Sequence, residues 1–382
     1  MARAASNDAP VAVVGGGVVG CAVALALARR GAPPVLLEGE RELCLGASGT
    51  NSGVLHTGFD SPPGELETRL ILRSAALRDP VLDGLSVPVL SCGAELAPRR
   101  EGDRDAIAAL GRSAEANGVS VGLRGDGVLE VPGESVTDPV AYTLALAAAA
   151  DALGADVRTG ARVEGIERRD DGLALACSGG DRVRCRVVVN CAGLYADEVA
   201  RLAGDDGFEI YPRKGEFFVF DPPGGKPLER ILLPVPTKRT KGVLVFPTVD
   251  GKVIAGPTAH DQDDKEDWSV RPEAAAQVLP KARAVLPELA EAEPVASYAG
   301  LRPAGRGVNY RIVPSPACPG LVNVAAIRST GLSASLGIAE RACELVDAHG
   351  VALTEERELP AIPAPAAGGE WWRRTARERL PG

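Results

Sequence analysis

The segment Val11-Ala12-Val13-Val14-Gly15-Gly16-Gly17-Val18-Val19-Gly20 decides the fold of this 382-residue chain. Four apolar residues that favour strands run directly into glycines spaced G-x-G-x-x-G, and an alanine-rich stretch of helical character follows up to Arg30-Gly31. A second apolar run, Val35-Leu36-Leu37, ends at Glu38, 18 residues after Gly20. This order of strand, glycine turn, helix, strand and acid is typical of a βαβ unit that binds a dinucleotide.

Each glycine of that pattern, and the acid after it, has a physical role here. Gly15 permits the tight turn, Gly17 lets the backbone approach a pyrophosphate, and Gly20 lets the helix pack closely on the strand. The helix N-terminus at Val18-Val19 offers free N–H groups and a positive dipole end to phosphates, and Glu38 can accept hydrogen bonds from a ribose. The glycines alone would also suit a turn in another α/β protein. Their place between strand and helix, with the acid after the second strand, makes the signal strong.

Composition limits the class of protein. A chain of 382 residues with 45% hydrophobic residues is expected to form two globular domains, and its net charge of −9 argues against a nucleic-acid partner. Three histidines and the absence of any C-x-x-C pair argue against a metal site. We expect the eight cysteines to be scattered buried thiols in a cytoplasmic protein, since the sequence shows neither a signal-peptide core nor an apolar run of ~20 residues.

The pattern of apolar residues along the rest of the chain predicts its helices, strands and domains. Periodicity predicts helices at Glu65–Leu82, Asp138–Leu153, Arg271–Leu286 and Gly331–His349, and successive strands from Tyr211 to Gly256. We therefore expect an α/β protein with one nucleotide domain assembled from separated segments, residues 1–85, 151–208 and 300–350. A sheet-rich substrate domain, residues 86–150 and 209–299, is expected to be inserted into it.

The C-terminal tail, residues 351–382, becomes rich in Pro, Ala and Gly from Ala361 and ends with Trp371-Trp372 beside four arginines. Such a linker cannot build a core of its own, which predicts that the tail is dispensable for cofactor binding. Alternatively, the tryptophans and arginines dock weakly on a partner or on an anionic membrane surface.

Three further motifs extend the nucleotide signal. The loop Gly46–Gly53 has small residues that let a ligand approach, and Ser48, Asn51 and Ser52 supply hydrogen-bond partners. The buried run Val187–Gly193 ends in small residues, and Ile327–Leu332 stands at the entry of the last long helix. Each motif alone could be a structural turn, but the set in this order is unlike a chance arrangement.

With these motifs the chain resembles the FAD-dependent oxidoreductases of the D-amino-acid oxidase superfamily, and most closely their glycerol-3-phosphate dehydrogenase/oxidase branch, near the L-2-hydroxyglutarate dehydrogenases. The resemblance runs from Val11 to His349 and is carried by Gly46–Asp60, Thr240–Thr248, Gly256–Ala259 and Tyr298–Pro303. It implies an FAD-binding Rossmann-like domain of the glutathione-reductase type. It also implies an inserted α+β substrate domain on a mostly antiparallel sheet, and non-covalent FAD.

The resemblance also implies which residues bind the cofactor. They are Gly15, Gly17, Val18, Val19, Gly20, Glu38, Gly39, Ala47, Ser48, Asn51, Ser52, Val163, Ala192, Gly193, Arg302, Gly331 and Leu332. The helix N-terminus at Gly331-Leu332 would direct its dipole at the pyrimidine end of the flavin and stabilise the anionic reduced ring.

For the chemistry, the resemblance puts the catalytic histidine at His56 and a catalytic and anion-binding arginine at Arg302. An ordinary imidazole titrates near pH ~6.5 and so can take a proton from an alcohol at neutral pH, and an arginine fork suits a carboxylate or phosphate. Lys241, Arg328, Ser329 and Thr330 would complete the substrate pocket. In the alternative interpretation His56 is merely hydrogen-bonded in a glycine-rich loop, and Lys241 is a solvated turn charge.

The expected reaction is oxidation of sn-glycerol 3-phosphate to dihydroxyacetone phosphate, with oxygen or a quinone as electron acceptor. The alternatives are a 2-hydroxy-acid oxidase of the L-2-hydroxyglutarate type and an amine or amino-acid oxidase. Two departures from the family pattern bear on the substrate: the stretch Ala304–Tyr310 lacks an acid, and the segment Arg73–Arg78 is unlike the usual one. The surroundings of Cys318 do not match a covalent flavin attachment, which favours non-covalent FAD. The loop Gly46–Gly53 argues against a nicotinamide dehydrogenase.

Overall fold

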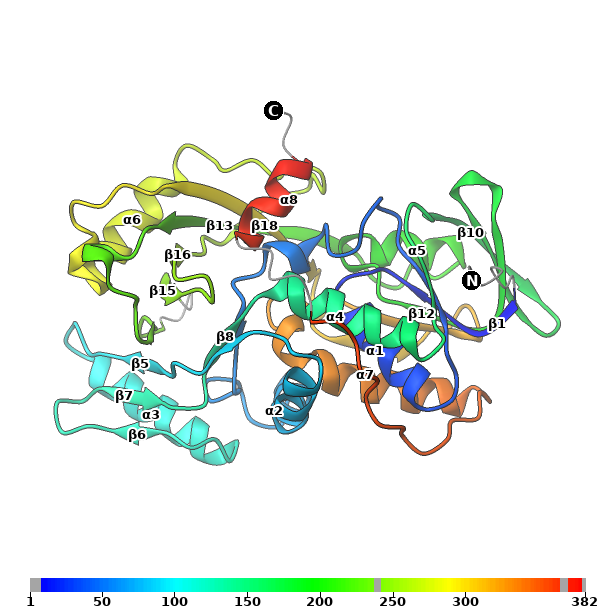
Figure 1. Ribbon diagram of the computed structural model, residues 1–382, viewed down its shortest axis with the longest axis horizontal. Helices are drawn as coiled ribbons and strands as arrows, with labels where there is room; N and C mark the ends of the chain where they lie inside the picture. Colours follow the sequence, from blue (N-terminus) through cyan, green and yellow to red (C-terminus); the bar gives the residue numbers. More distant parts are fainter. Residues whose placement is uncertain (1–7, 237–241, 365–369, 380–382) are drawn as a thin grey trace.

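The computed structural model describes residues 8–236, 242–364 and 370–379. Its first sheet has a parallel centre (Figure 1). The order is β9 (Asp156–Arg158), β2 (Val35–Leu37), β1 (Asp8–Val14), β12 (Arg182–Asn190) and β20 (Leu321–Ala325). The hairpin of β10 (Val163–Arg169) and β11 (Gly172–Cys177) pairs antiparallel with the first half of β12, and β19 (Arg311–Pro314) pairs antiparallel with β20. The predicted α/β class with a Rossmann-like nucleotide unit is confirmed.

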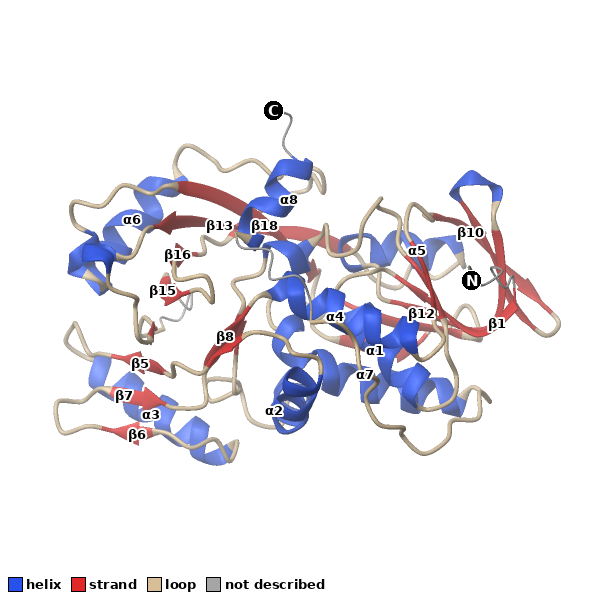
Figure 2. Ribbon diagram, in the orientation of Figure 1, coloured by secondary structure: helices blue, strands red, loops and turns tan. Residues whose placement is uncertain are grey.

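Both faces of this sheet are covered where its central strands are apolar at every position, over Val11–Val14 of β1 and Val187–Val189 of β12. Val11 and Val13 face the helices α1 (Val18–Arg29), α2 (Leu66–Gly84), α4 (Pro139–Ala152) and α7 (Gly331–Ala348). Ala12 and Val14 face the side that holds residues of β10, β11 and α5 (Ala196–Leu202). Figure 2 shows the four long helices gathered on one side of the strands.

The predicted helices lie close to their expected limits. Helix α4 begins as its sequence indicates, because Asp138 Oδ1 accepts hydrogen bonds from the N–H groups of Val140 (2.8 Å) and Ala141 (2.9 Å), and Pro139 occupies the first helical position. The last long helix starts at Gly331, as expected. Helix α3 (Asp103–Ala116) was not predicted.

The second sheet is mostly antiparallel and forms the expected α+β unit. Strand β13 (Ile210–Phe220) has β18 (Ala296–Gly305) along one edge, and β16 (Val253–Gly256) and β17 (His260–Asp261) along the other. The sheet continues through β15 (Leu244–Pro247), β14 (Ile231–Leu232), β5 (Ala94–Leu96), β7 (Leu129–Val131) and β6 (Gly122–Leu123). Helix α6 (Ala274–Val285) packs on one face, and a small sheet of β3 (Val54–Leu55), β8 (Ser135–Thr137) and β4 (Val89–Leu90) adjoins the helical layer.

Two elements bear on the domain limits. Helix α4 packs against α1 in the nucleotide unit, and β18 is a strand of the substrate sheet through to Gly305. We therefore propose that the inserted substrate domain comprises residues 86–137 and 209–305, rather than 86–150 and 209–299.

The C-terminal tail ends in an ordered helix, α8 (Trp371–Arg379), which sequence reasoning missed. Trp371 and Trp372 are 2% and 1% exposed, and they share an apolar cluster with Phe217 and Tyr298 of the substrate sheet. The expectation that these tryptophans dock on a partner or a membrane is wrong, because their indole rings are buried against the chain itself. In the part of the chain that the structure describes, no helix has the length and apolarity needed to cross a bilayer.

Candidate active site

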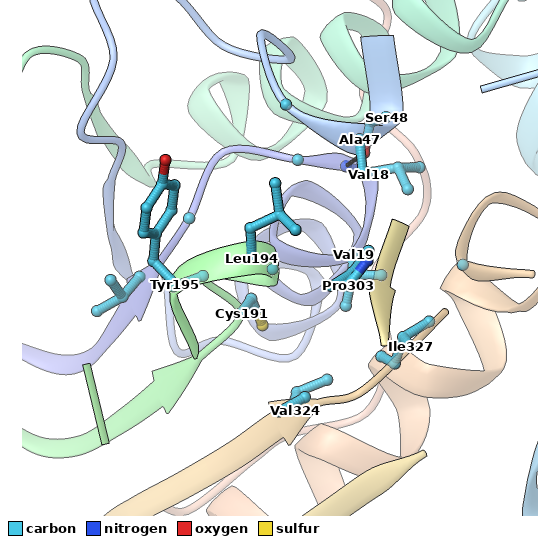
Figure 3. A pocket seen from close by; sticks show the side chains of 18 of the residues that line it. Val18, Val19, Ala47, Ser48, Cys191, Leu194, Tyr195, Pro303, Val324 and Ile327 are labelled. Atoms are coloured by element: carbon cyan, nitrogen blue, oxygen red, sulfur yellow. Dashed lines mark hydrogen bonds between the residues drawn. The ribbon is translucent and has the colours of Figure 1, made fainter. Parts of the chain in front are cut away.

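A cavity of about 330 Å³ opens where the carboxyl ends of β1, β2, β12 and β20 meet the substrate sheet. Parallel strands end at the same edge of a sheet, so turns far apart in sequence converge there. In Figure 3, Val18 at the start of α1 lies beside Ala47 and Ser48, and Val324 and Ile327 line the wall across from them. The cavity therefore unites the dinucleotide turn, the loop Gly46–Gly53, the end of β12 and the entry of α7.

The glycines at the turn are required by close backbone contacts. Gly15 has a φ of +109°, and a Cβ at Gly20 would overlap the carbonyl oxygen of Gly15. A Cβ on Gly17 would lie 3.0 Å from Ser48 Oγ, the same oxygen that accepts the N–H of Val18 at 3.0 Å. Ser48 thus satisfies the first N–H of α1, and the N-cap residue Gly17 has no side chain to cap the rest of the first turn, which begins beside the cavity.

We expect the substitution Gly20→Ala to destabilise the apoprotein by about 1–3 kcal/mol, because the added methyl must push α1 away from β1. Chemical unfolding followed by circular dichroism measures the loss. Gly125→Ala is the matched control, since a Cβ there meets nothing within 4 Å. Equal unfolding midpoints for the two variants would contradict the packing argument.

Glu38 is fixed at the far end of the turn. Its Oε2 accepts the N–H of Gly16 at 2.6 Å and its Oε1 accepts the N–H of Glu40 at 2.8 Å. Burial raises the pKa of Glu38, and these two backbone hydrogen bonds oppose the rise. Each carboxylate oxygen keeps a lone pair, so the side chain can accept further hydrogen bonds from a ligand's hydroxyls.

A positive wall faces the cavity from β18 and from the entry of α7. Arg302 donates from Nε to the carbonyl of Arg213 (3.0 Å) and from Nη2 to those of Lys214 (3.1 Å) and Thr258 (2.9 Å). Burial, together with the neighbouring charges of Arg213 and Arg328, lowers the pKa of Arg302 to about 10. Arg302 forms no ion pair with a carboxylate of the described residues, so its charge is available to an anionic ligand.

His56 is held by a carboxylate that the sequence did not single out. Its Nδ1 lies 2.8 Å from Oε2 of Glu134, whose side chain is fully buried. The other oxygen of Glu134 accepts the N–H (2.6 Å) and the hydroxyl (2.9 Å) of Thr57. The backbone N–H of His56 donates to Ser333 Oγ in the first turn of α7 (2.9 Å), so the segment that carries the imidazole is tied to the helix whose first residues line the cavity.

The structure brings most of the expected site residues together. On the cavity lie Gly15, Gly17, Val18, Val19, Glu38, Gly39, Ala47, Ser48, Asn51, Val163, Ala192, Gly193, Arg302, Arg328, Ser329, Gly331 and Leu332. The lining does not include Gly20, Ser52, His56 or Thr330. Lys241 lies outside the described residues.

Thr330 lies off the cavity because its hydroxyl is already engaged. It is buried, donates to Glu67 Oε1 at 2.6 Å and lies 2.7 Å from the hydroxyl of Tyr310. We therefore assign Thr330 to the support of the α7 entry rather than to the substrate pocket.

Sequence reasoning missed several residues of the lining. Arg162, Tyr195, Trp268 and Arg379 all face the cavity, and each comes from a different segment. Trp268 is one of three tryptophans in the chain, and that rarity could have marked it as a candidate site residue. Arg162 and Tyr195 stand in stretches with no distinguishing pattern.

Comparison with known proteins finds a matching family model and related sequences. A family model described as FAD dependent oxidoreductase (DAO) matches residues 10–345. A glycerol 3-phosphate dehydrogenase from Caloramator mitchellensis is 28% identical over 344 residues, which cover 86% of this chain and 72% of the relative. The mitochondrial L-2-hydroxyglutarate dehydrogenase of Mus musculus is 31% identical over 277 residues, 64% of this chain and 60% of the relative.

Among solved structures, the dithionite-reduced L-alpha-glycerophosphate oxidase from Mycoplasma pneumoniae with FAD bound matches with a TM-score of 0.84. It is 27% identical, and the match covers 93% of this chain and 100% of that chain.

Proposed function

The chain belongs to the DAO family of FAD-dependent oxidoreductases, and from that premise we propose that it oxidises sn-glycerol 3-phosphate to dihydroxyacetone phosphate. The observation that carries the proposal is the positive wall of the cavity, where Arg302 has no carboxylate partner among the described residues and Arg328 lies close enough to lower its pKa. Such a wall suits a small phosphorylated alcohol. The names of the relatives, a glycerol 3-phosphate dehydrogenase and a glycerophosphate oxidase, support the same substrate.

The residues of the cavity fit FAD. The N-terminus of α1 and the glycine turn would hold the pyrophosphate, and Glu38 would accept the ribose hydroxyls. The indole N–H of Trp268, buried on the cavity wall, has no hydrogen-bond partner among the described residues, so a ligand acceptor would satisfy it. When bound, FAD accepts the hydride that leaves the substrate carbon.

The protein must then remove the hydroxyl proton, and we propose His56 for this role. With its Nδ1–H donating to Glu134, the imidazole carries its lone pair on Nε2, the tautomer that can accept a proton. The buried carboxylate also stabilises the imidazolium that forms. Glu134 acts through His56 and is therefore a positioning residue.

We expect Glu134→Gln to lower the limiting rate of substrate oxidation more than tenfold without changing the substrate half-saturation. The N–H and hydroxyl of Thr57 would still donate to the side-chain oxygen of the new glutamine, so its NH₂ group would face His56 Nδ1. Nδ1 would then accept that hydrogen bond, and the imidazole proton would move to Nε2, the atom that must take the substrate proton. Stopped-flow kinetics of the holoenzyme measure both constants.

The double variant His56→Ala/Glu134→Gln shows whether Glu134 acts by positioning His56 or affects the rate in another way. If Glu134 acts only through His56, the double variant is as slow as His56→Ala alone. A further loss in the double variant would show that Glu134 has a separate role. Glu130→Gln, at a half-exposed position that pairs with surface arginines, is the matched control.

The substrate assignment is tested by anaerobic bleaching of the flavin band near about 450 nm. The panel pairs sn-glycerol 3-phosphate with glycerol, L-2-hydroxyglutarate with L-lactate, and glycine with proline. Bleaching fastest with sn-glycerol 3-phosphate supports the proposal, and bleaching fastest with L-2-hydroxyglutarate or an amine overturns it. Mixing the reduced enzyme with oxygen or with a soluble quinone then identifies the acceptor class.

A further inference from the structure

Helix α8 is fastened to the loop that forms one wall of the cofactor cavity. Arg374 donates from Nη2 to Glu42 Oε2 (2.6 Å) and to the carbonyl of Leu43 (3.0 Å). Thr375, which is 1% exposed, lies directly over Gly49 in the 3-10 turn Ala47–Thr50. In Figure 1 α8 lies across the long strands of the substrate sheet, and it contacts β18 and the 3-10 turn. The C-terminal helix thus packs on both the substrate sheet and the cofactor loop.

Its last described residue reaches the cavity itself. Arg379 donates from Nε to the carbonyl of Leu45 (3.2 Å) and forms ion pairs with Glu40 (3.1 Å) and Glu266 (3.5 Å). Its guanidinium carbon lies 5.3 Å from the ring centre of Trp268, and its side chain is only 14% exposed. Arg379 and Trp268 both line the cavity, at the end where Glu38 and Glu40 stand.

These contacts join three separate segments over one end of the cavity. Glu40 follows the ribose acid Glu38, Glu266 belongs to the loop before α6, and Arg379 ends α8. Because two carboxylates already neutralise Arg379, its charge is engaged in holding the segments together and is not left free for a phosphate. A ligand lying along Glu38 would be covered by the Arg379–Trp268 pair.

We propose that α8 is part of the cofactor site and that Arg379 closes the nucleotide end of the cavity, so that FAD leaves only after α8 detaches. This inference depends on FAD binding and not on the identity of the substrate. The family match ends at residue 345, so α8 lies outside the residues that it covers. This closing role of α8 replaces the expectation that the tail is dispensable for flavin binding.

Thermodynamic linkage gives the proposal a second consequence. If docked α8 strengthens FAD binding by some factor, bound FAD must strengthen α8 docking by the same factor. Trypsin at low concentration reports on docking, because Arg373 and Arg374 become cleavable only when the helix detaches.

The first experiment measures FAD release from the holoprotein. The fluorescence of FAD is followed after dilution of Arg379→Ala, Arg379→Lys and Arg373→Ala, and the dissociation constant is obtained by titrating each apoprotein with FAD. We expect Arg379→Ala to release FAD at least tenfold faster and to bind it at least tenfold more weakly. The release rate and dissociation constant of Arg379→Lys should lie between those of Arg379→Ala and the unsubstituted protein, since lysine keeps the positive charge but loses the planar guanidinium. Arg373→Ala removes a side chain that pairs with Glu370, the residue just before α8, and should stay within twofold.

The second experiment compares tryptic cleavage of α8 in the apoprotein and holoprotein. We expect FAD to slow cleavage at least tenfold in the unsubstituted chain and much less in Arg379→Ala. Release of FAD from Arg379→Ala at the unsubstituted rate would overturn the proposal. Equal cleavage of the apoprotein and holoprotein would overturn it as well. Neither readout requires turnover, so they stand apart from the test of the substrate.

Discussion

His56→Ala is expected to slow the anaerobic reduction of the flavin by substrate about 10²–10⁴-fold, the usual contribution of a positioned general base. Removal of the imidazole leaves water to take the hydroxyl proton in the transition state. The half-saturation for substrate and the FAD content should change little, since His56 does not line the cofactor cavity and only its backbone N–H holds Ser333.

Stopped-flow reduction across substrate concentrations, at pH 6–9, measures the limiting rate of this variant. His260→Ala is the matched control, because His260 is exposed on strand β17 and lies off the cavity. A limiting rate for His56→Ala equal to that of the unsubstituted enzyme would show that the proton leaves by another route. His56→Ala also leaves Glu134 as a buried carboxylate whose remaining hydrogen bonds, among the described residues, are those with Thr57, so a thermal unfolding curve should accompany the kinetics.

The fold was predictable where the sequence pattern is local. The turn from Val11 to Gly20, the cap at Asp138-Pro139 and the start of α7 at Gly331 each depend on neighbouring residues, and the structure confirms all three elements. Helix α8 was missed because its tryptophans and arginines are explained only by partners far away in sequence. Trp372 meets the substrate sheet, and Arg374 meets Glu42, more than 300 positions earlier.

The residues of the candidate site also fall into those that local sequence patterns predict and those that depend on distant partners. The glycines, Glu38 and Ser48 stand in recognisable spacings, and the structure places them on one cavity. Glu134 had no such signal: it is an ordinary acid after the turn Pro132-Gly133, and its role follows only from a fold that buries it 2.8 Å from His56 Nδ1. Long-range pairing of a carboxylate with an imidazole cannot be read from either residue's neighbours.

Arg302→Ala is expected to raise the half-saturation for an anionic substrate about 10- to 100-fold, because charge-assisted hydrogen bonds contribute roughly 1.5–3 kcal/mol. The contact with the anion exists in both the ground state and the transition state, so the limiting rate should fall much less. Since the pKa of Arg302 is about 10, its guanidinium is charged throughout the neutral range in which the assay is run.

The substitution has a structural cost that must be separated from the loss of charge. Arg302 satisfies the carbonyls of Arg213, Lys214 and Thr258, and alanine leaves them without that donor. Arg213→Ala is the matched control, because Arg213 lies directly across from Arg302 in the β13–β18 register but forms an ion pair with the half-exposed Asp261 and lies off the cavity. Both variants should retain FAD, which absorbance of the purified proteins verifies.

A comparison of two substrates isolates the charge effect. Structural damage at β18 would weaken the binding of sn-glycerol 3-phosphate and of uncharged glycerol alike. Loss of the anion contact weakens the binding of the phosphorylated substrate only. The ratio of their kcat/KM values should therefore fall about 10- to 100-fold in Arg302→Ala and stay constant in Arg213→Ala. An unchanged ratio would show that Arg302 does not bind the anionic group of the substrate. Arg328, the other guanidinium on the cavity wall, would then be the residue to substitute, because its exposed side chain bears the same charge beside the N-terminus of α7.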